Sequence, residues 1–251
     1  MLIINADDLG RDRAASDACF IGHERRVITS ASLMVFMADS ARAAELARPA
    51  RLETGLHINL TQAYDGPGVP AAVRESQERV ARYLRLGKWP QVVYNPLLKG
   101  AFASTFAWQL EEYRRLLGRD PDHYDGHNHM HLSMNMIVGG FIPEGSRVRR
   151  SFTFRRGEKS ALNRLYRRRL DAWLIGRHTT TGAFFSLDPV GDRPRLQRIV
   201  DLARTADVEL MVHPWRDDQF ALLMSGPFRD LVGSVPCGAQ GDLQPGQARR
   251  A

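Results

Sequence analysis

The stretch LIINADDLG, residues 2–10, joins an apolar run to two adjacent aspartates and a glycine. An apolar run of this length predicts a buried strand. Neighbouring carboxylates repel each other, and burying them is costly unless a cation or hydrogen-bond donors compensate. A turn or a helix N-cap after the strand would also explain Asp7 and Asp8, because aspartate is favoured in both positions. The rest of the sequence must decide between a cap and a charged site.

Short apolar runs alternate with segments of helical spacing along the chain. Strands are predicted at residues 2–7, 27–35, 54–60 and 208–214, and helices at 13–26, 40–48, 104–117, 159–175 and 193–206. This alternation indicates parallel β/α units whose helices cover a sheet. In such folds the chemistry gathers at the C-terminal ends of the strands.

The composition does not change along the chain, so we expect one domain over residues 1–233. Residues 61–103 hold several prolines and glycines with weak periodicity, and we interpret them as an insertion that forms a wall of the substrate site or an oligomer contact. From residue 234 onwards the chain is rich in Gly, Gln, Pro and Ala, which predicts a flexible tail over 234–251.

Composition places the chain among ordinary globular proteins, with 43% hydrophobic and 25% charged residues. Cys19 and Cys237 lie far apart and match no metal-binding spacing, which favours a reducing compartment. The first residues show no leader pattern, and no run approaches the roughly 20 apolar residues of a membrane span. We therefore expect a cytoplasmic protein without a membrane partner.

Positive charge is concentrated in residues 147–169, RVRRSFTFRRGEKSALNRLYRRR. This segment carries ten lysines and arginines against one glutamate, so the net charge of +7 leaves −2 for the rest of the chain. Such a patch can meet nucleic acid, acidic lipid or an anionic substrate, although a solvated helix face and loop would have the same composition. Only Phe152, Phe154 and Tyr166 accompany the charges, so the segment does not predict a platform for stacked bases.

Four polar clusters follow apolar runs: Asp7 with Asp8, His57 in TGLHINL, the stretch DGHNHMH at 125–131, and His213 in ELMVHP. They supply carboxylates and imidazoles but no thiolate, a set suited to Zn, Mn, Fe or Mg. Any one of these histidines alone could be an ordinary core residue, but an accident at all four places is improbable.

The histidines at 127, 129 and 131 would share one face of an extended strand, so they cannot all bind one metal unless the chain turns there. We expect one or two to bind metal or substrate while the others pack or support. The three histidines outside the pattern are expected to be surface or structural residues: His23, His123 and His178.

The segments NADDLG, ITSASLMV, GLHINLT, DGHNHMH and ELMVHP occur in the order and at about the spacing of the YdjC/ChbG/HpnK-like carbohydrate deacetylases. The resemblance runs from residue 2 to about 215. It implies a single-domain distorted (β/α) barrel of the polysaccharide-deacetylase-like kind. It also implies metal-dependent removal of acetyl groups from N-acetylated sugars or oligosaccharides.

Carried over to this chain, the resemblance implies that Asp8, His57 and His127 bind one divalent cation, with Mg²⁺ as the family metal and Zn²⁺ as the alternative. Asp7 would be the general base, and His213 would act near the scissile amide. The residues expected to contact substrate or support the ligands are His129, His131 and Asp125. The implied partner is an acetylated sugar or oligosaccharide, and a homodimer is compatible with the sequence.

This assignment explains the adjacent aspartates. Successive residues at a strand end point in different directions, so one carboxylate can bind the metal while the other accepts a proton from the attacking water. The cation offsets the repulsion between the carboxylates.

Three other readings remain open at this stage. One is a different metal-dependent hydrolase, such as a phosphoesterase in which the basic segment holds a phosphate; a two-metal enzyme of that kind needs more ligands. Another is a non-catalytic nucleic-acid-binding protein that uses residues 147–169, although we do not expect nucleic acid as the partner. The third is a barrel that keeps its metal and has lost its activity.

Overall fold

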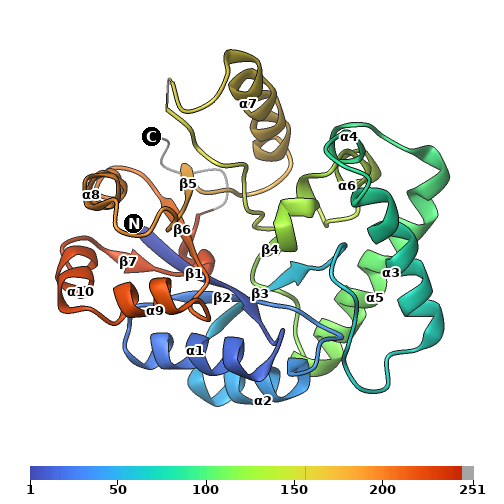
Figure 1. The fold of residues 1–251 in the computed structure, drawn as a ribbon, viewed down its shortest axis with the longest axis horizontal. Helices are drawn as coiled ribbons and strands as arrows, with labels where there is room; N and C mark the ends of the chain where they lie inside the picture. The colour runs from blue at the N-terminus through green and yellow to red at the C-terminus, as the bar shows by residue number, and fades with distance from the viewer. Residues whose placement is uncertain (156, 245–251) are drawn as a thin grey trace. The chain divides into compact units, whose positions relative to one another are not determined.

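The computed structural model of the protein describes residues 1–155 and 157–244 (Figure 1). The chain forms two compact units, and each unit consists of segments that are separated in the sequence. The first unit comprises residues 1–6, 18–31 and the chain from 144 onwards, and the second comprises 7–17 and 32–143. The chain passes between units within β1 (Leu2–Leu9), α1 (Arg13–Glu24) and β2 (Ser30–Leu33), so each of these elements contributes to both.

In the first unit the strand order is β2-β1-β6-β5, with β7 also paired to β1. The pairs of β1 with β6, β5 with β6 and β1 with β7 are all parallel, and Leu2 lies opposite Val208. The strands and helices of this unit that have not yet been given are β5 (Ala183–Ser186), β6 (Val208–Val212), β7 (Cys237–Gly238), α7 (Ala161–Ile175), α8 (Arg193–Leu202), α9 (Asp217–Leu223), α10 (Gly226–Val232) and the 3₁₀ turn η3 (Gln240–Asp242).

In the second unit the strand order is β4-β3-β2-β1. The pair of β3 with β4 is parallel, and its register sets His57 opposite Asp125. The further elements of this unit are β3 (Glu53–Ile58), β4 (Tyr124–Gly126), α2 (Ser40–Ala50), α3 (Ala71–Leu84), α4 (Trp89–Val92), α5 (Lys99–Leu117), α6 (Met134–Gly139) and the 3₁₀ turns η1 (Pro96–Leu98) and η2 (His127–Leu132).

All eight residues of β1 are buried, which accounts for the apolar run that opens the sequence. β1 has a paired strand on each side, so it is an interior strand whose backbone groups are not left at an open edge of the sheet. The predicted α/β class with a parallel sheet is confirmed. Among the described residues the strand order is an open path, so the predicted barrel is incomplete.

The insertion at residues 61–103 contains a helix that its weak periodicity did not predict. α3 buries Val73, Val80 and Leu84, and it runs beside α5 (Figure 1). Its stripe is interrupted by Gln77, a buried polar residue whose side chain donates to the carbonyl of Gln62. The insertion belongs to the second unit, and its assignment as part of a single domain stays a prediction.

The predicted tail differs from the structure over its described part. β7 pairs with β1, and Val235 and Leu243 are buried. A few apolar side chains therefore fix residues 234–244 on the first unit, although Gly, Gln and Pro dominate their composition. Residues 245–251 of the predicted tail lie outside the described part of the chain. None of the described helices has the length and apolar character needed to cross a bilayer.

Candidate metal centre

The two adjacent aspartates lie at the carboxyl end of β1, and both are buried, with exposures of 2% for Asp7 and 1% for Asp8. Asp8 has a φ of 69°, in the left-handed region that non-glycine residues seldom adopt. Aspartate tolerates this conformation better than most residues. This conformation interrupts the extended backbone of β1 at Asp8, near the end of the strand.

Asp8 lies between two imidazoles. Its Oδ1 atom is 3.4 Å from Nε2 of His57 and 3.0 Å from Nδ1 of His127. Its Oδ2 atom accepts a hydrogen bond from Nη1 of Arg11 at 3.2 Å. One nitrogen of each imidazole is therefore directed at the same carboxylate oxygen.

His57 reaches this position because β3 and β4 are in parallel register. Asp125 is directly across from it, and the Asp125 Oδ1 atom is 2.8 Å from Nδ1 of His57. A carboxylate on one ring nitrogen fixes the orientation of the imidazole and leaves the other nitrogen for a ligand. Metal-binding histidines commonly have this arrangement.

His127 follows β4 at a sharp turn. Asn128 and His129 have φ angles of 54° and 59°, so the segment DGHNHMH turns instead of remaining extended. A Cβ atom on Gly126 would lie 2.9 Å from the backbone nitrogen of His131, so this glycine is needed for the close approach. The turn separates the three histidines that an extended strand would have placed on one face.

Two groups of side chains have potential ligand atoms within 4.8 Å of one another: Asp8 with His57 and His127, and Asp7 with His57 and Asp125. His57 belongs to both groups, so the described residues offer one complete set rather than two independent ones. The first group consists of the three residues that the resemblance implies as ligands. The second includes Asp7, the implied base, and Asp125, the implied supporting residue.

The electrostatics of the site favour a bound cation. Burial alone would raise the pKa of Asp8, but hydrogen bonds and charge from His127 and His57 hold it well below its usual range. Burial alone would lower the pKa of His57, but the carboxylates of Asp125 and Asp7 raise it from 6.5 to about 10. Without a metal, a proton on His57 is thus needed to balance the buried carboxylates.

Ser32 and His123 extend the site in a direction that the sequence did not predict. The Ser32 hydroxyl donates to Oδ2 of Asp125 at 2.7 Å and lies 3.1 Å from Nε2 of His123. Both side chains are buried, and a Cβ atom on Gly55 would lie 2.4 Å from the His123 ring. His123 was expected to be surface or structural, but it stands behind the carboxylate that orients His57. The spacing of His123 and Asp125, two residues apart along a strand, was the available signal.

The other predicted site histidines are not members of the two candidate metal groups. Neither candidate metal group contains His129 or His131; His131 is buried against Gly126, and the two imidazole centroids are 6.5 Å apart. His213 belongs to the first unit and follows β6, where its backbone N–H donates to Oε1 of Gln219 at 2.6 Å. Its ring packs edge-on against Trp215.

The residues present fit a divalent cation. One carboxylate and two imidazoles converge, the second nitrogen of His57 is fixed by Asp125, and the buried carboxylates require positive charge. Cations with mixed oxygen and nitrogen ligands are held by donor sets of this kind.

Comparison with known proteins gives relatives with related names. A carbohydrate deacetylase of Mus musculus is 34% identical over 138 residues, which cover 52% of this chain and 43% of that protein. A chitooligosaccharide deacetylase of Klebsiella pneumoniae subsp. pneumoniae is 30% identical over 149 residues, which cover 57% of this chain and 56% of that protein. The chain thus spans about half the length of the curated relatives it matches.

The fold has a solved counterpart in a candidate cellobiose-phosphate cleavage protein of Enterococcus faecalis V583. The two structures superpose with a TM-score of 0.68 at 17% identity, over 95% of this chain and 97% of the other. The profile of the YdjC-like protein family matches residues 1–232. Because that match takes in both candidate metal groups and nearly the whole chain, the protein belongs to the YdjC-like family.

Proposed function

We propose that the protein is a metal-dependent hydrolase that removes acetyl groups from N-acetylated sugars or oligosaccharides. The observation that carries the proposal is the buried group Asp8, His57 and His127, with Asp125 behind His57 and Asp7 beside it. The names of the curated relatives support the substrate class.

Each residue of the group has a distinct task. Asp8, His57 and His127 would hold the cation, and the carboxylate of Asp125 keeps a proton on Nδ1 of His57, which leaves Nε2 as its ligand atom. In that position a divalent cation would supply Lewis-acid chemistry, polarising the amide carbonyl and lowering the pKa of the attacking water. Asp7 accepts the proton that this water loses. The remaining task, donating a proton to the leaving amine, falls to His213 by the family resemblance alone.

The identity of the metal can be argued from the donor atoms. The resemblance implies Mg²⁺, which prefers oxygen ligands and retains most of its waters. Two imidazoles in a set of three favour Zn²⁺ or another transition metal instead. We therefore propose that the site takes Zn²⁺ more tightly than Mg²⁺, and competition between the two ions in metal-free protein tests this order.

The phosphoesterase reading is weakened by the ligand count. Two-metal phosphoesterases need two sets of ligands, and His57 is shared between the two groups of the described residues. A homodimer, which the sequence allows, stays a prediction that sedimentation would test.

Elemental analysis together with acetate release tests the proposal. The purified protein should contain one divalent ion per chain and release acetate from at least one N-acetylated sugar in a panel that also includes O-acetylated sugars. Asp8→Ala, His57→Ala and His127→Ala should each lose the ion, whereas His23→Ala, an imidazole outside the group, should retain it. Stoichiometric metal in all three variants after dialysis would refute the ligand assignment.

A further inference from the structure

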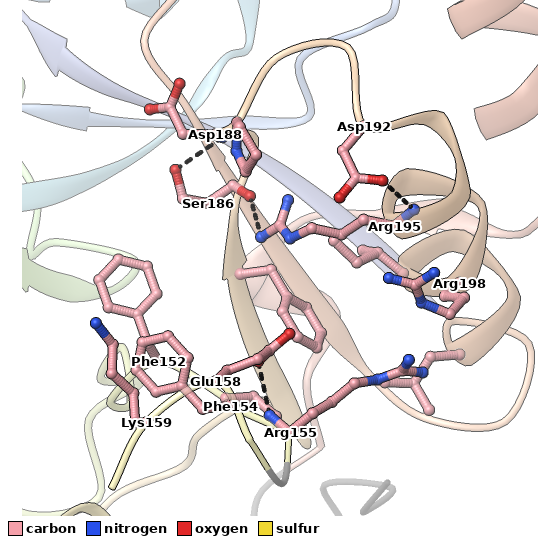
Figure 2. Close-up of a pocket in the computed structure, with 15 residues that line it drawn as sticks. Phe152, Phe154, Arg155, Glu158, Lys159, Ser186, Asp188, Asp192, Arg195 and Arg198 are labelled. Atoms are coloured by element: carbon pink, nitrogen blue, oxygen red, sulfur yellow. Dashed lines mark hydrogen bonds between the residues drawn. The ribbon is translucent and has the colours of Figure 1, made fainter. Parts of the chain in front are cut away.

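The basic segment 147–169 has no task in the proposed deacetylation. In the structure its residues 152–155, 158 and 159 line a pocket of about 570 Å³, whose other walls are the end of β5 and helix α8. The pocket lies wholly within the first unit. Figure 2 shows Phe152, Phe154 and Lys159 on the side opposite Arg195 and Arg198.

Four cationic side chains line this pocket: Arg155, Lys159, Arg195 and Arg198. None of them forms a salt bridge within the described part of the chain. The three carboxylates of the same walls have other partners. Asp192 accepts from the backbone nitrogen of Arg195, Asp188 pairs with Arg216, and Glu158 accepts from the backbone nitrogen of Arg155. The four cations and three carboxylates leave the pocket walls with a net charge of +1, and the carboxylates act on Arg195 through charge without forming a salt bridge to it.

Arg195 illustrates how a cation is held beside the pocket. Its guanidinium donates to the carbonyl of Ser186 at 2.8 Å, which fixes its position beside the pocket (Figure 2). The side chain is partly buried, and burial lowers the pKa of its guanidinium. A partly desolvated cation of this kind gains from an anion placed next to it.

The opposite wall is aromatic. Phe152 stacks on Phe184 with centroids 4.6 Å apart, and its ring lies 6.0 Å from that of Phe154. Phe154 has Lys159 within 5.3 Å and Arg167 within 5.0 Å of its centroid. These contacts fix the rings of Phe152 and Phe154, which the sequence analysis had not predicted to form a platform. A fixed aromatic wall favours a flat ring as the neighbouring part of a ligand.

We propose that this pocket binds a small organic phosphate, namely a phosphate ester that also bears a flat aromatic ring and is about the size of a mononucleotide. Guanidinium groups hold phosphate oxygens in paired hydrogen bonds, and the phenyl rings contact the flat ring of the ligand. The volume suits a compound of this size. A nucleic-acid strand fits less well, because strand-binding surfaces repeat their aromatic platforms along a groove, whereas these rings and cations surround one hollow.

Calorimetric titration of the full chain in metal-free buffer tests the proposal. The probes are adenosine 5′-monophosphate, ribose 5-phosphate, adenosine, inorganic phosphate and a single-stranded oligonucleotide. We expect adenosine 5′-monophosphate to bind at least tenfold more tightly than ribose 5-phosphate, adenosine or inorganic phosphate, because only it uses both walls. Arg198→Gln, an exposed position, and the pair Arg195→Gln with Arg198→Gln should each weaken its binding at least tenfold. Arg229→Gln in α10 removes the same charge outside the pocket and should leave binding unchanged.

Several results would overturn the proposal. If adenosine 5′-monophosphate, ribose 5-phosphate and inorganic phosphate bind with equal affinity, the aromatic wall has no role. If Arg229→Gln weakens binding as much as Arg198→Gln does, the effect is one of net charge alone. If the oligonucleotide binds more tightly than adenosine 5′-monophosphate, the pocket is part of a nucleic-acid-binding surface instead. Absence of binding at millimolar nucleotide would end the proposal. None of these results bears on acetate release, so the deacetylase proposal is tested separately.

Discussion

At the scale of single residues, Asp7 and Asp8 have different surroundings although they are covalent neighbours. Asp8 faces His57 and His127, whereas Asp7 groups with His57 and Asp125. Successive residues of a strand point to opposite faces, which gives the two carboxylates different neighbours apart from the shared His57. Two adjacent carboxylates can therefore be proposed for two different roles, Asp8 as a metal ligand and Asp7 as the general base.

The division predicts opposite effects of two amide substitutions. Asp7→Asn keeps the shape of the side chain but cannot accept a proton, so kcat should fall by about 10²–10⁴-fold while metal content stays unchanged. Asp8→Asn should lose metal, because an amide is a weaker ligand than a carboxylate. Steady-state kinetics with elemental analysis measures both. Asp17→Asn, an exchange at a carboxylate that pairs with Arg42, serves as the control. A fully active Asp7→Asn protein would remove the base assignment.

Ser32 is predicted to act as a positioning residue for the metal group. Ser32→Ala removes the hydrogen bond to Asp125 and loosens the orientation of His57, so metal affinity should fall by about 10–100-fold. Isothermal titration with Zn²⁺ measures the affinity directly. Ser32→Thr, which keeps the hydroxyl, should restore most of the affinity if the bond matters. An affinity unchanged in Ser32→Ala would show that Asp125 needs no support.

How far the sequence predicted the site also follows from particular residues. Residue types and strand-end positions marked the polar clusters that contain Asp8, His57 and His127, and the family resemblance selected these three as the implied ligands. The roles of His129 and His131 could not be separated, because the turn depends on left-handed conformations at Asn128 and His129. Local sequence did not indicate those conformations.

At the scale of elements, the turn between β4 and η2 controls the approach of His127. Gly126→Ala places a Cβ atom against the backbone nitrogen of His131, so the turn must shift. We expect a loss of stability of about 1–3 kcal/mol and weaker metal binding. Gly100→Ala in α5, where a Cβ atom meets nothing within 4 Å, should not destabilise the protein. Thermal unfolding and zinc titration of both variants provide the comparison, and equal behaviour would contradict the steric argument.

Two helices show which sequence patterns predict a helix and which do not. The helix at 104–117 was predicted from its apolar stripe and Gly118, and α5 ends at Leu117 but begins five residues earlier, at Lys99. α3 was missed because Gln77 occupies a position of its buried face. A buried glutamine paired with a carbonyl packs as well as an apolar residue, but it weakens the periodic signal.

At the scale of the whole molecule, the charge of the metal group should make stability depend on pH. The pKa of His57 is about 10 in the folded metal-free protein and 6.5 in the unfolded chain, so the folded state holds this proton more tightly. Its contribution is therefore complete below pH 6.5 and is lost as the pH rises towards 10. The slope is at most about 1.4 kcal/mol per pH unit for this one proton.

Urea unfolding between pH 6 and 10 measures this dependence. Metal-free protein should lose stability across the interval, whereas His57→Gln should lack that component. Protein saturated with Zn²⁺ should lack it too, because the ion replaces the proton. The same slope in wild type and His57→Gln would assign the dependence to other groups.

The pairing of β1 with β6 has a consequence for synthesis on the ribosome. Leu2 pairs with Val208, so β1 must wait for a partner 206 residues later in the chain, roughly 10–40 s at ordinary rates of translation. The strands that carry Asp8, His57 and Asp125 are complete much earlier. During that interval an eight-residue strand of buried type has one edge without its final neighbour, which invites pairing with other nascent chains. Chaperones that shield this edge, or a lower growth temperature that slows aggregation, should therefore raise the yield of folded protein. Substitutions of exposed surface residues should raise it less.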